Sequence, residues 1–153
     1  MIIIRKANSS DSQFIVRFQL DMALETENLS LDPIVVGKGV KAVFQDNSKG
    51  SYYIAELDGT VVGSLMTTYE WSDWRNGRVL WIQSVFVDAL HRGKGIYRKL
   101  YEHVKSLVQH DETDFRGIRL YVDKTNSTAQ KVYGKLGMEN HHYEMYEWMN
   151  DQD

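Results

Sequence analysis

The sequence predicts a mixed α/β fold of the α+β kind, with helices packed on one central, mostly antiparallel sheet. Short apolar segments typical of strands occur between segments in which apolar residues recur at helical spacing. Asp58-Gly59 and Asn76-Gly77 are turn signals that separate three consecutive strand-like segments in the middle of the chain. The length of 153 residues suits one domain, so we expect a single domain over residues 1–153.

The first elements are expected in the order strand, helix, helix. Residues 2–4 are typical of a strand, and Ser10 with Gln13 fits a capping box that opens a helix running into the 20s. A short second helix is expected around residues 40–44. The two turn signals then join an antiparallel meander of strands at residues 52–57, 61–69 and 79–87.

The second half of the chain is expected to continue as helix, strand, helix and strand. Apolar residues recur every four positions from Ile96 to Val108 and predict a helix that runs to about His110. The remaining elements are a strand at residues 118–122, a helix opened by a capping box of Ser127 and Gln130 and ended by Gly137, and a strand at residues 143–148.

Composition excludes several classes of protein. The chain has no Cys, which excludes disulfides, Cys nucleophiles, zinc fingers and iron–sulfur clusters. A mean hydropathy of −0.44 argues against a membrane protein, and a net charge of −3 gives no general attraction to nucleic acid. We expect a cytoplasmic protein. His141-His142 has no third ligand at a useful spacing, so we expect no metal.

One short segment is basic although the protein as a whole is acidic. Residues 91–105 hold Arg92, Lys94, Arg98, Lys99 and Lys105 against a single carboxylate, Glu102. The segment Arg92-Gly93-Lys94-Gly95-Ile96-Tyr97 follows a strand and opens a helix. Unpaired N–H groups at a helix start, with glycines and cations beside them, form a cradle for phosphate. The alternative is a glycine-rich turn that only starts a solvated helix.

Two motifs make this chain resemble the GNAT superfamily of N-acetyltransferases. Arg92 and Gly95 match its coenzyme A motif R/Q-x-x-G-x-G/A, whereas Tyr97 replaces the last small residue. After the fifth strand the family carries N-x-x-A-x-x-x-Y-x-x-x-G, and this chain matches it with Asn126, Ala129, Tyr133 and Gly137. The order of elements along the whole chain also agrees.

The resemblance implies a coenzyme site between a fourth and a fifth strand that splay apart. The pantetheine arm of acetyl-CoA would pair with the fourth strand at Phe86 and Val87, and Asn126 would contact that arm while also capping its helix. The pyrophosphate would bind the N–H groups of residues 92–97. The residues expected there are Arg92, Gly93, Lys94, Gly95, Ile96 and Tyr97, with Arg92, Lys94 and Arg98 neutralising phosphates.

Tyr133 matches the general acid of the family. Aminolysis of a thioester forms an oxyanion and expels a thiolate, which a phenol within reach can protonate. Core packing is the alternative role for a helical Tyr. The identity of the general base stays open, because the strand at 81–87 has no carboxylate, whereas many relatives carry Glu on this strand. The candidates are Glu70, Glu25, Glu27 or a water chain through Gln83 and Ser84.

Acidic and aromatic residues suggest a cationic acceptor. The candidates are Glu25, Glu27, Asp32, Tyr69, Glu70, Trp71, Asp73 and Trp74, with Gln83 on the neighbouring strand. Alternatively the acids are ordinary surface, and Trp71 and Trp74 pack against a neighbour or dimer partner.

We therefore expect a cytoplasmic N-acetyltransferase that moves acetyl from acetyl-CoA directly to a primary amine of a small molecule, with no nucleic-acid or membrane partner. We expect a homodimer. The alternatives are acetylation of a protein or peptide amino group, and a non-catalytic acyl-CoA-binding module.

Overall fold

The structure, a computed structural model, describes residues 1–110 and 112–150. The chain forms two compact units, Met1–Arg119 and Leu120–Asp153. Among the described residues, the first holds the five strands and the helices α1 to α3, and the second holds α4. A single domain over residues 1–153 stays a prediction.

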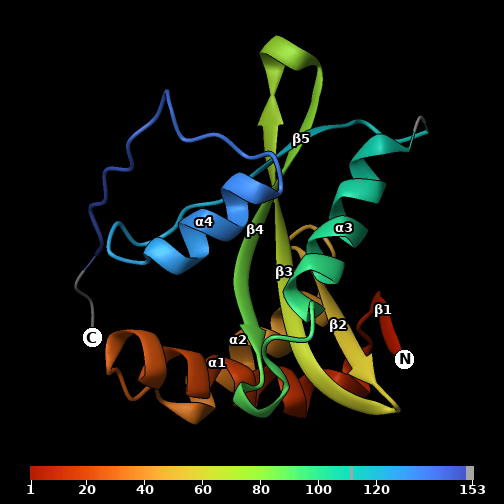
Figure 1. The fold of residues 1–153 in the computed structure, drawn as a ribbon, viewed down its shortest axis with the longest axis vertical. Helices are drawn as coiled ribbons and strands as arrows, with labels where there is room; N and C mark the ends of the chain where they lie inside the picture. Colours follow the sequence, from red (N-terminus) through yellow and green to blue (C-terminus); the bar gives the residue numbers. More distant parts are fainter. Residues whose placement is uncertain (111, 151–153) are drawn as a thin grey trace. The chain divides into compact units, whose positions relative to one another are not determined.

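The first unit is built on one mixed sheet with the strand order β1-β2-β3-β4-β5 (Figure 1). Its strands are β1 (Ile2–Lys6), β2 (Ser51–Leu57), β3 (Thr60–Ser72), β4 (Gly77–Val87) and β5 (Phe115–Arg119). Neighbouring strands are antiparallel except β4 and β5, which are parallel. The predicted mixed, mostly antiparallel sheet is confirmed, including the central meander of β2, β3 and β4.

Local turn chemistry explains the first hairpin of the meander. Asp58 and Gly59 connect β2 to β3 with φ values of 50° and 85°, as a type I′ turn requires. The second connection is longer than a two-residue turn. A 3₁₀ turn, η2 (Asp73–Arg75), ends at Asn76 with φ 44°, and β4 begins at Gly77.

Helices cover both faces of this sheet. Tyr52 and Tyr53 are adjacent on β2 and therefore face opposite ways. Tyr52 packs on Phe44 of α2 (Pro33–Gln45) with ring centroids 5.7 Å apart, and Tyr53 packs on His103 of α3 (Ile96–Gln109) at 5.1 Å. The helix α1 (Ser12–Glu27) lies on the α2 side. The core on that side consists of Ala7, Ile15, Phe18, Val40, Val43, Tyr52, Ile54, Val61 and Phe86.

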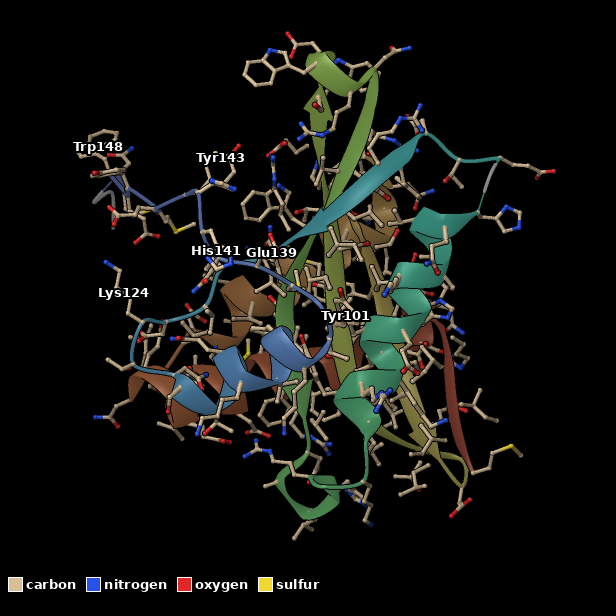
Figure 2. All side chains as sticks on the ribbon, turned by 45° about the horizontal axis from the view of Figure 1, so that its top comes forward. Tyr101, Lys124, Glu139, His141, Tyr143 and Trp148 are labelled. Atoms are coloured by element: carbon tan, nitrogen blue, oxygen red, sulfur yellow. The ribbon has the colours of Figure 1, made fainter. Side chains whose placement is uncertain are left out.

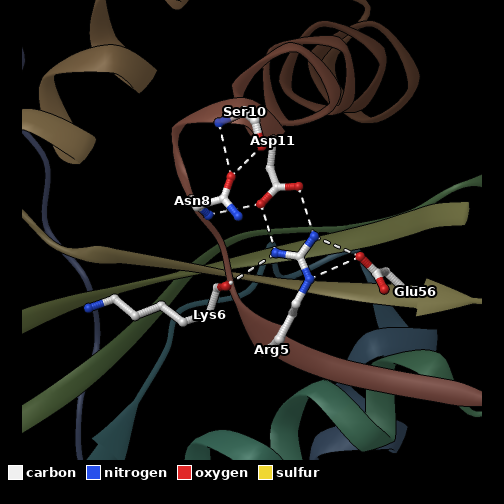
Figure 3. Close-up of polar contacts among 6 residues, drawn as sticks. All are labelled: Arg5, Lys6, Asn8, Ser10, Asp11 and Glu56. Atoms are coloured by element: carbon white, nitrogen blue, oxygen red, sulfur yellow. Dashed lines mark hydrogen bonds and ion pairs between the residues drawn. The ribbon is translucent and has the colours of Figure 1, made fainter. Parts of the chain in front are cut away.

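The start of α1 differs from the prediction of a Ser10–Gln13 capping box. A short 3₁₀ turn, η1 (Ser9–Asp11), precedes the helix, and the box is formed by Asn8 and Asp11. Asp11 is buried and accepts two hydrogen bonds from Arg5, at 2.9 and 3.0 Å, besides the N–H of Asn8 (Figure 3). Arg5 also donates to Glu56 on β2. The buried carboxylate of Asp11 is held by Arg5, six residues earlier, and the box that forms is the local Asn8–Asp11 pair, two residues before the predicted one.

Helix α4 (Ser127–Lys135) of the second unit is capped by Asn126, whose Oδ1 accepts from the N–H of Ala129 at 3.1 Å. The predicted Ser127–Gln130 box is therefore wrong, because the side chain of Gln130 donates instead to the carbonyls of Asp123 and Lys124. The predicted stop at Gly137 is confirmed by its φ of 86°.

The predicted last strand at residues 143–148 is not formed. Among the described residues, those from 138 to 150 have no regular secondary structure, and Figure 2 shows Glu139, His141, Tyr143 and Trp148 along this irregular segment. A segment that could form a strand does so only where a neighbouring strand pairs with it. The sheet has no strand beyond β5 in the described part of the chain. The fifth strand itself lies earlier than the predicted 118–122.

No helix among residues 1–110 and 112–150 combines the length and the apolar character that crossing a bilayer requires.

Candidate active site

The strand β4 has an edge that is paired over only part of its length. Its residues Arg78 to Trp81 pair with β5, and from Ile82 to Val87 it pairs with β3 alone within the described sheet. The predicted splaying of the fourth and fifth strands is confirmed by this loss of pairing. A free strand edge presents backbone N–H and C=O groups that an extended ligand can pair with.

A bulge bends β4 at the start of this free edge. Gln83 faces Met66 and Phe86 faces Ser64, so two residues of β4, Ser84 and Val85, oppose only Leu65 of β3. Ser84 adopts φ 51°, which is uncommon for a residue with a side chain. The sequence analysis missed the bulge, because no glycine marks it.

The strands β3 and β4 approach closely beyond the bulge, and this approach requires a glycine. A Cβ on Gly63 would lie 2.9 Å from the carbonyl oxygen of Phe86. A hydrogen is therefore the only side chain that fits there, and Gly63 allows β4 to stay paired with β3 as far as Val87.

The connection from β4 to α3 ends in an open backbone cradle. Asp88 caps the 3₁₀ turn η3 (Ala89–His91) by accepting from the N–H of Leu90 at 3.1 Å. Gly93 and Gly95 then adopt φ values of 79° and 77°, and apart from their chain neighbours no described residue comes within 4 Å of where a Cβ would stand on either. No side chain caps the N-terminus of α3 at Gly95. The first N–H groups of a 14-residue helix, with the positive end of its dipole, therefore suit a diphosphate.

Tyr97 stands where the motif has a small residue. Its hydroxyl oxygen is buried and the side chain is half-buried. The tip of the ring is thus directed into the protein, and the backbone at this position keeps its place in the first turn of α3.

The predicted phosphate cations are not equally available. Arg92 gives both terminal nitrogens to the carboxylate of Glu25 on α1, at 2.5 and 2.9 Å, and its Nε to the carbonyl of Val87 at 2.9 Å. Arg92 thereby holds the pKa of Glu25 below its usual value. Arg98 donates to Glu102 at 2.8 Å, whereas Lys94 is exposed beside the cradle.

Glu70 and Gln83 lie on the sheet face that α1 and α2 cover. Glu70 accepts from the indole N–H of Trp81 at 3.1 Å and pairs with Arg119 of β5 at 2.5 Å. Gln83 donates to the hydroxyl of Thr68 at 2.7 Å. This polar row extends along β3 and β4 up to the bulge.

The other acceptor candidates are spread over separate elements. Glu27 is exposed at the last residue of α1, and Asp32 caps α2 by accepting from the N–H of Ile34 at 2.8 Å. Trp71 and Trp74 are 61% and 91% exposed near the far end of the β3–β4 hairpin. The structure brings Glu25 to Arg92 and Glu70 to Arg119. Among the described residues, Glu25 and Glu70 are not hydrogen-bonded to each other, so the structure does not join them in one acidic cluster.

The second motif lies wholly in the second unit. Asn126 caps α4, and Tyr133 lies on the same helix with its side chain half-buried. The carbonyl of Tyr133 accepts from the N–H of Met138 at 3.1 Å, which closes the C-terminal turn around Gly137. No cluster of side chains that could hold a metal ion occurs in the part of the chain that is described.

Comparisons with known proteins agree with this geometry. The chain superposes on the crystal structure of a possible acetyltransferase from Clostridium difficile 630 with a TM-score of 0.91, 44% identity and 99% coverage of both chains. It is 28% identical to streptothricin acetyltransferase of Escherichia coli over 84% of this chain and 71% of that protein. A predicted acetyltransferase from Clostridium acetobutylicum, crystallised with acetyl-CoA, shares the fold with a TM-score of 0.71, 18% identity and coverage of 99% and 96%.

The sequence model of the acetyltransferase (GNAT) family matches residues 21–138, which include both motifs. The chain therefore belongs to the GNAT family and is an acetyl-CoA-dependent N-acetyltransferase.

Proposed function

We propose that this enzyme transfers acetyl from acetyl-CoA directly to a primary amine of a small molecule, with Tyr133 as the general acid. One observation carries the proposal: the free edge of β4 is followed, after the short segment of residues 88–95, by the N-terminus of α3, which no side chain caps. A chain of peptide-like groups that ends in a diphosphate matches this pair of features.

The residues of the cradle fit that co-substrate. The backbone at Gly93 and Gly95 is not covered by side chains, and Lys94 between them adds an exposed cation. Phe86 and Val87 lie on the part of β4 that has no β5 partner. We assign the diphosphate to the N–H groups of residues 93–97 and the pantetheine arm to Phe86 and Val87.

The chemistry needs a stabilised oxyanion and a protonated leaving group. The coenzyme supplies an activated thioester. Backbone N–H groups near the Ser84 bulge are suited to polarise its carbonyl, because the bulge leaves part of the strand without ladder partners. Tyr133 is proposed to donate its phenolic proton to the departing thiolate, and Asn126 to contact the coenzyme arm from the same helix.

The acceptor is proposed to be a cationic small molecule. Glu27 is exposed at the end of α1, and Glu70 and Gln83 contribute polar groups to the sheet face below that helix. The similarity to streptothricin acetyltransferase supports a small-molecule acceptor. Glu25 is a poor base because Arg92 lowers its pKa, so we favour removal of the amine proton through water near Gln83 and Ser84. The homodimer and the cytoplasmic location stay predictions.

The test is acetyl-CoA turnover with a panel of amines, amino acids and peptides, followed as release of free thiol. The protein contains no Cys and adds nothing to that readout. We expect release that depends on a small amine. Release that depends only on peptides would mean that the acceptor is a peptide or protein amino group. Acetyl-CoA binding without thiol release would favour a non-catalytic acyl-CoA-binding module.

Tyr133→Phe tests the acid. We expect kcat to fall on the order of 100-fold or more, because general acid catalysis is typically worth that much, while acetyl-CoA affinity is retained. Tyr146→Phe is the matched control, since Tyr146 is 90% exposed on the irregular segment after α4. Normal turnover by the Tyr133 variant would exclude it as the acid.

A further inference from the structure

Helix α1 places two opposite charges against the segment that joins β4 to α3. Glu25 holds Arg92 through two hydrogen bonds of 2.5 and 2.9 Å. Arg17, two turns earlier on the helix, lies 3.7 Å from the carboxylate of Asp88. Asp88 begins this segment and Arg92 lies in its middle, and each meets the opposite charge on α1. We call these four residues the α1 latch.

An aromatic contact joins the two halves of the latch. The rings of Phe18 on α1 and Phe86 on β4 are buried with their centroids 5.4 Å apart. The guanidinium of Arg17 lies 5.0 Å from the Phe18 ring, and that of Arg92 lies 5.4 Å from the Phe86 ring. The cations are therefore fixed by ring faces as well as by carboxylates, which restricts how far the segment can shift along α1.

The same segment determines where the cradle backbone lies. Asp88 donates its N–H to the carbonyl of Val62 at 2.8 Å, and Arg92 donates its Nε to the carbonyl of Val87 at 2.9 Å. Gly93 follows Arg92 directly, and neither Gly93 nor Gly95 has a neighbour within 4 Å of a built Cβ. Glycines without packing partners lose much conformational entropy when they become ordered. Because Arg92 is already fixed, the entropic cost of ordering Gly93 and Gly95 when the diphosphate binds is lower.

We propose that Glu25 is a positioning residue for the coenzyme site. It acts through Arg92, holding residues 88–95 in the conformation that binds the diphosphate, and it does not itself touch the coenzyme. This inference rests on the proposed function, which places the diphosphate at residues 93–97. It also assigns Arg92 mainly to the latch, because its terminal nitrogens and its Nε have protein partners.

Glu25→Gln tests the proposal, because the amide keeps the size of the side chain and removes the charge. Asp21→Asn is the matched control: Asp21 is an exposed carboxylate one turn earlier on α1. For each variant we would measure KM for acetyl-CoA, KM for the amine and kcat. Amide hydrogen exchange over residues 88–97 of the free protein supplies a readout that does not need the coenzyme.

In Glu25→Gln we expect a three- to tenfold higher KM for acetyl-CoA, faster amide exchange in the segment, and little change in kcat or in KM for the amine. That range reflects the modest strength of a half-exposed pair with two charged hydrogen bonds. In an Arg92→Gln background, Glu25→Gln should add nothing further, because the partner is already lost.

Three results would overturn the proposal: exchange and KM for acetyl-CoA as in Asp21→Asn, an equal further loss in the Arg92→Gln background, or tighter coenzyme binding. Tighter binding would mean that Glu25 competes with phosphate for Arg92. If the wild-type protein binds no acetyl-CoA, the proposed function fails, and faster exchange in Glu25→Gln alone still supports the latch.

Discussion

The two ends of β4 differ in how closely the glycines near them are packed. At its beginning, Gly77 is packed so closely that a Cβ would overlap the carbonyl oxygen of Asp114 and lie 2.7 Å from Cγ of Arg116. At its end, Gly93 and Gly95 of the following segment have no neighbour within 4 Å of a Cβ. Close packing of side chains and backbone closes one end, and the other end leaves its backbone N–H groups accessible.

The charges follow the same division. Arg78 at the closed end donates to Asp114 at 2.9 Å, and its guanidinium lies 4.9 and 4.6 Å from the ring centroids of Tyr69 and Phe115. That cation is enclosed by parallel rings and a carboxylate. At the open end the ion pair of Glu25 and Arg92 stands beside the cradle and leaves the backbone free. The closed end is packed to stabilise the sheet, and we propose that the open end binds the co-substrate.

Gly77→Ala should break the closed end and cause the largest loss of stability. We expect the free energy of unfolding to fall by about 2–4 kcal/mol, because the new Cβ meets a backbone oxygen that cannot move cheaply. Urea unfolding measures the change. Gly37→Ala is the control, since a Cβ at Gly37 of α2 has open space, and it should cost nothing. Equal stability of the two variants would contradict the packing account.

Gly95→Ala, at the open end, should weaken co-substrate binding more than it lowers the stability of the fold. Its φ of 77° makes a side chain strained there, so we expect a smaller loss of stability, about 1 kcal/mol, from strain alone. The Kd for acetyl-CoA should rise at least tenfold, because the methyl group stands on the surface assigned to the diphosphate. Calorimetric titration measures this, and an unchanged Kd in the folded variant would remove residue 95 from the site.

Acid should release the latch at the open end, with the smallest effect of the three. Arg92 lowers the pKa of Glu25 from 4.5, so the ion pair contributes stability above about pH 4.5 and loses it as the pH falls through the lowered value. Amide exchange over residues 88–95, corrected for its intrinsic pH dependence, should therefore increase below that pH in the wild type. Glu25→Gln should show a smaller transition, because the carboxylate of Asp88 opposite Arg17 remains, and a transition of equal size in that variant would exclude Glu25 as its source.

The sequence predicted best what adjacent residues determine. The hairpin at Asp58-Gly59 and the end of α4 at Gly137 depend on φ values that Gly permits and few other residues adopt. The coenzyme motif was recognisable because a strand, two glycines and a helix start are consecutive in the chain.

Features that depend on distant partners could not be read in this way. The latch joins Glu25 to Arg92 across 67 positions. The Ser84 bulge is set by how β3 and β4 pair, and nothing in the local sequence marks it. The expected strand at 143–148 shows the reverse error, because a segment that could form a strand does not form one without a partner strand.

The most direct test of the contrast is amide hydrogen exchange along β4 and both of its ends, with and without acetyl-CoA. We expect acetyl-CoA to slow exchange at residues 82–87 and 93–97 and to leave residues 72–78 unchanged. Protection confined to the closed end, or no protection at residues 93–97 at saturating acetyl-CoA, would contradict the assignment of the open end as the co-substrate site.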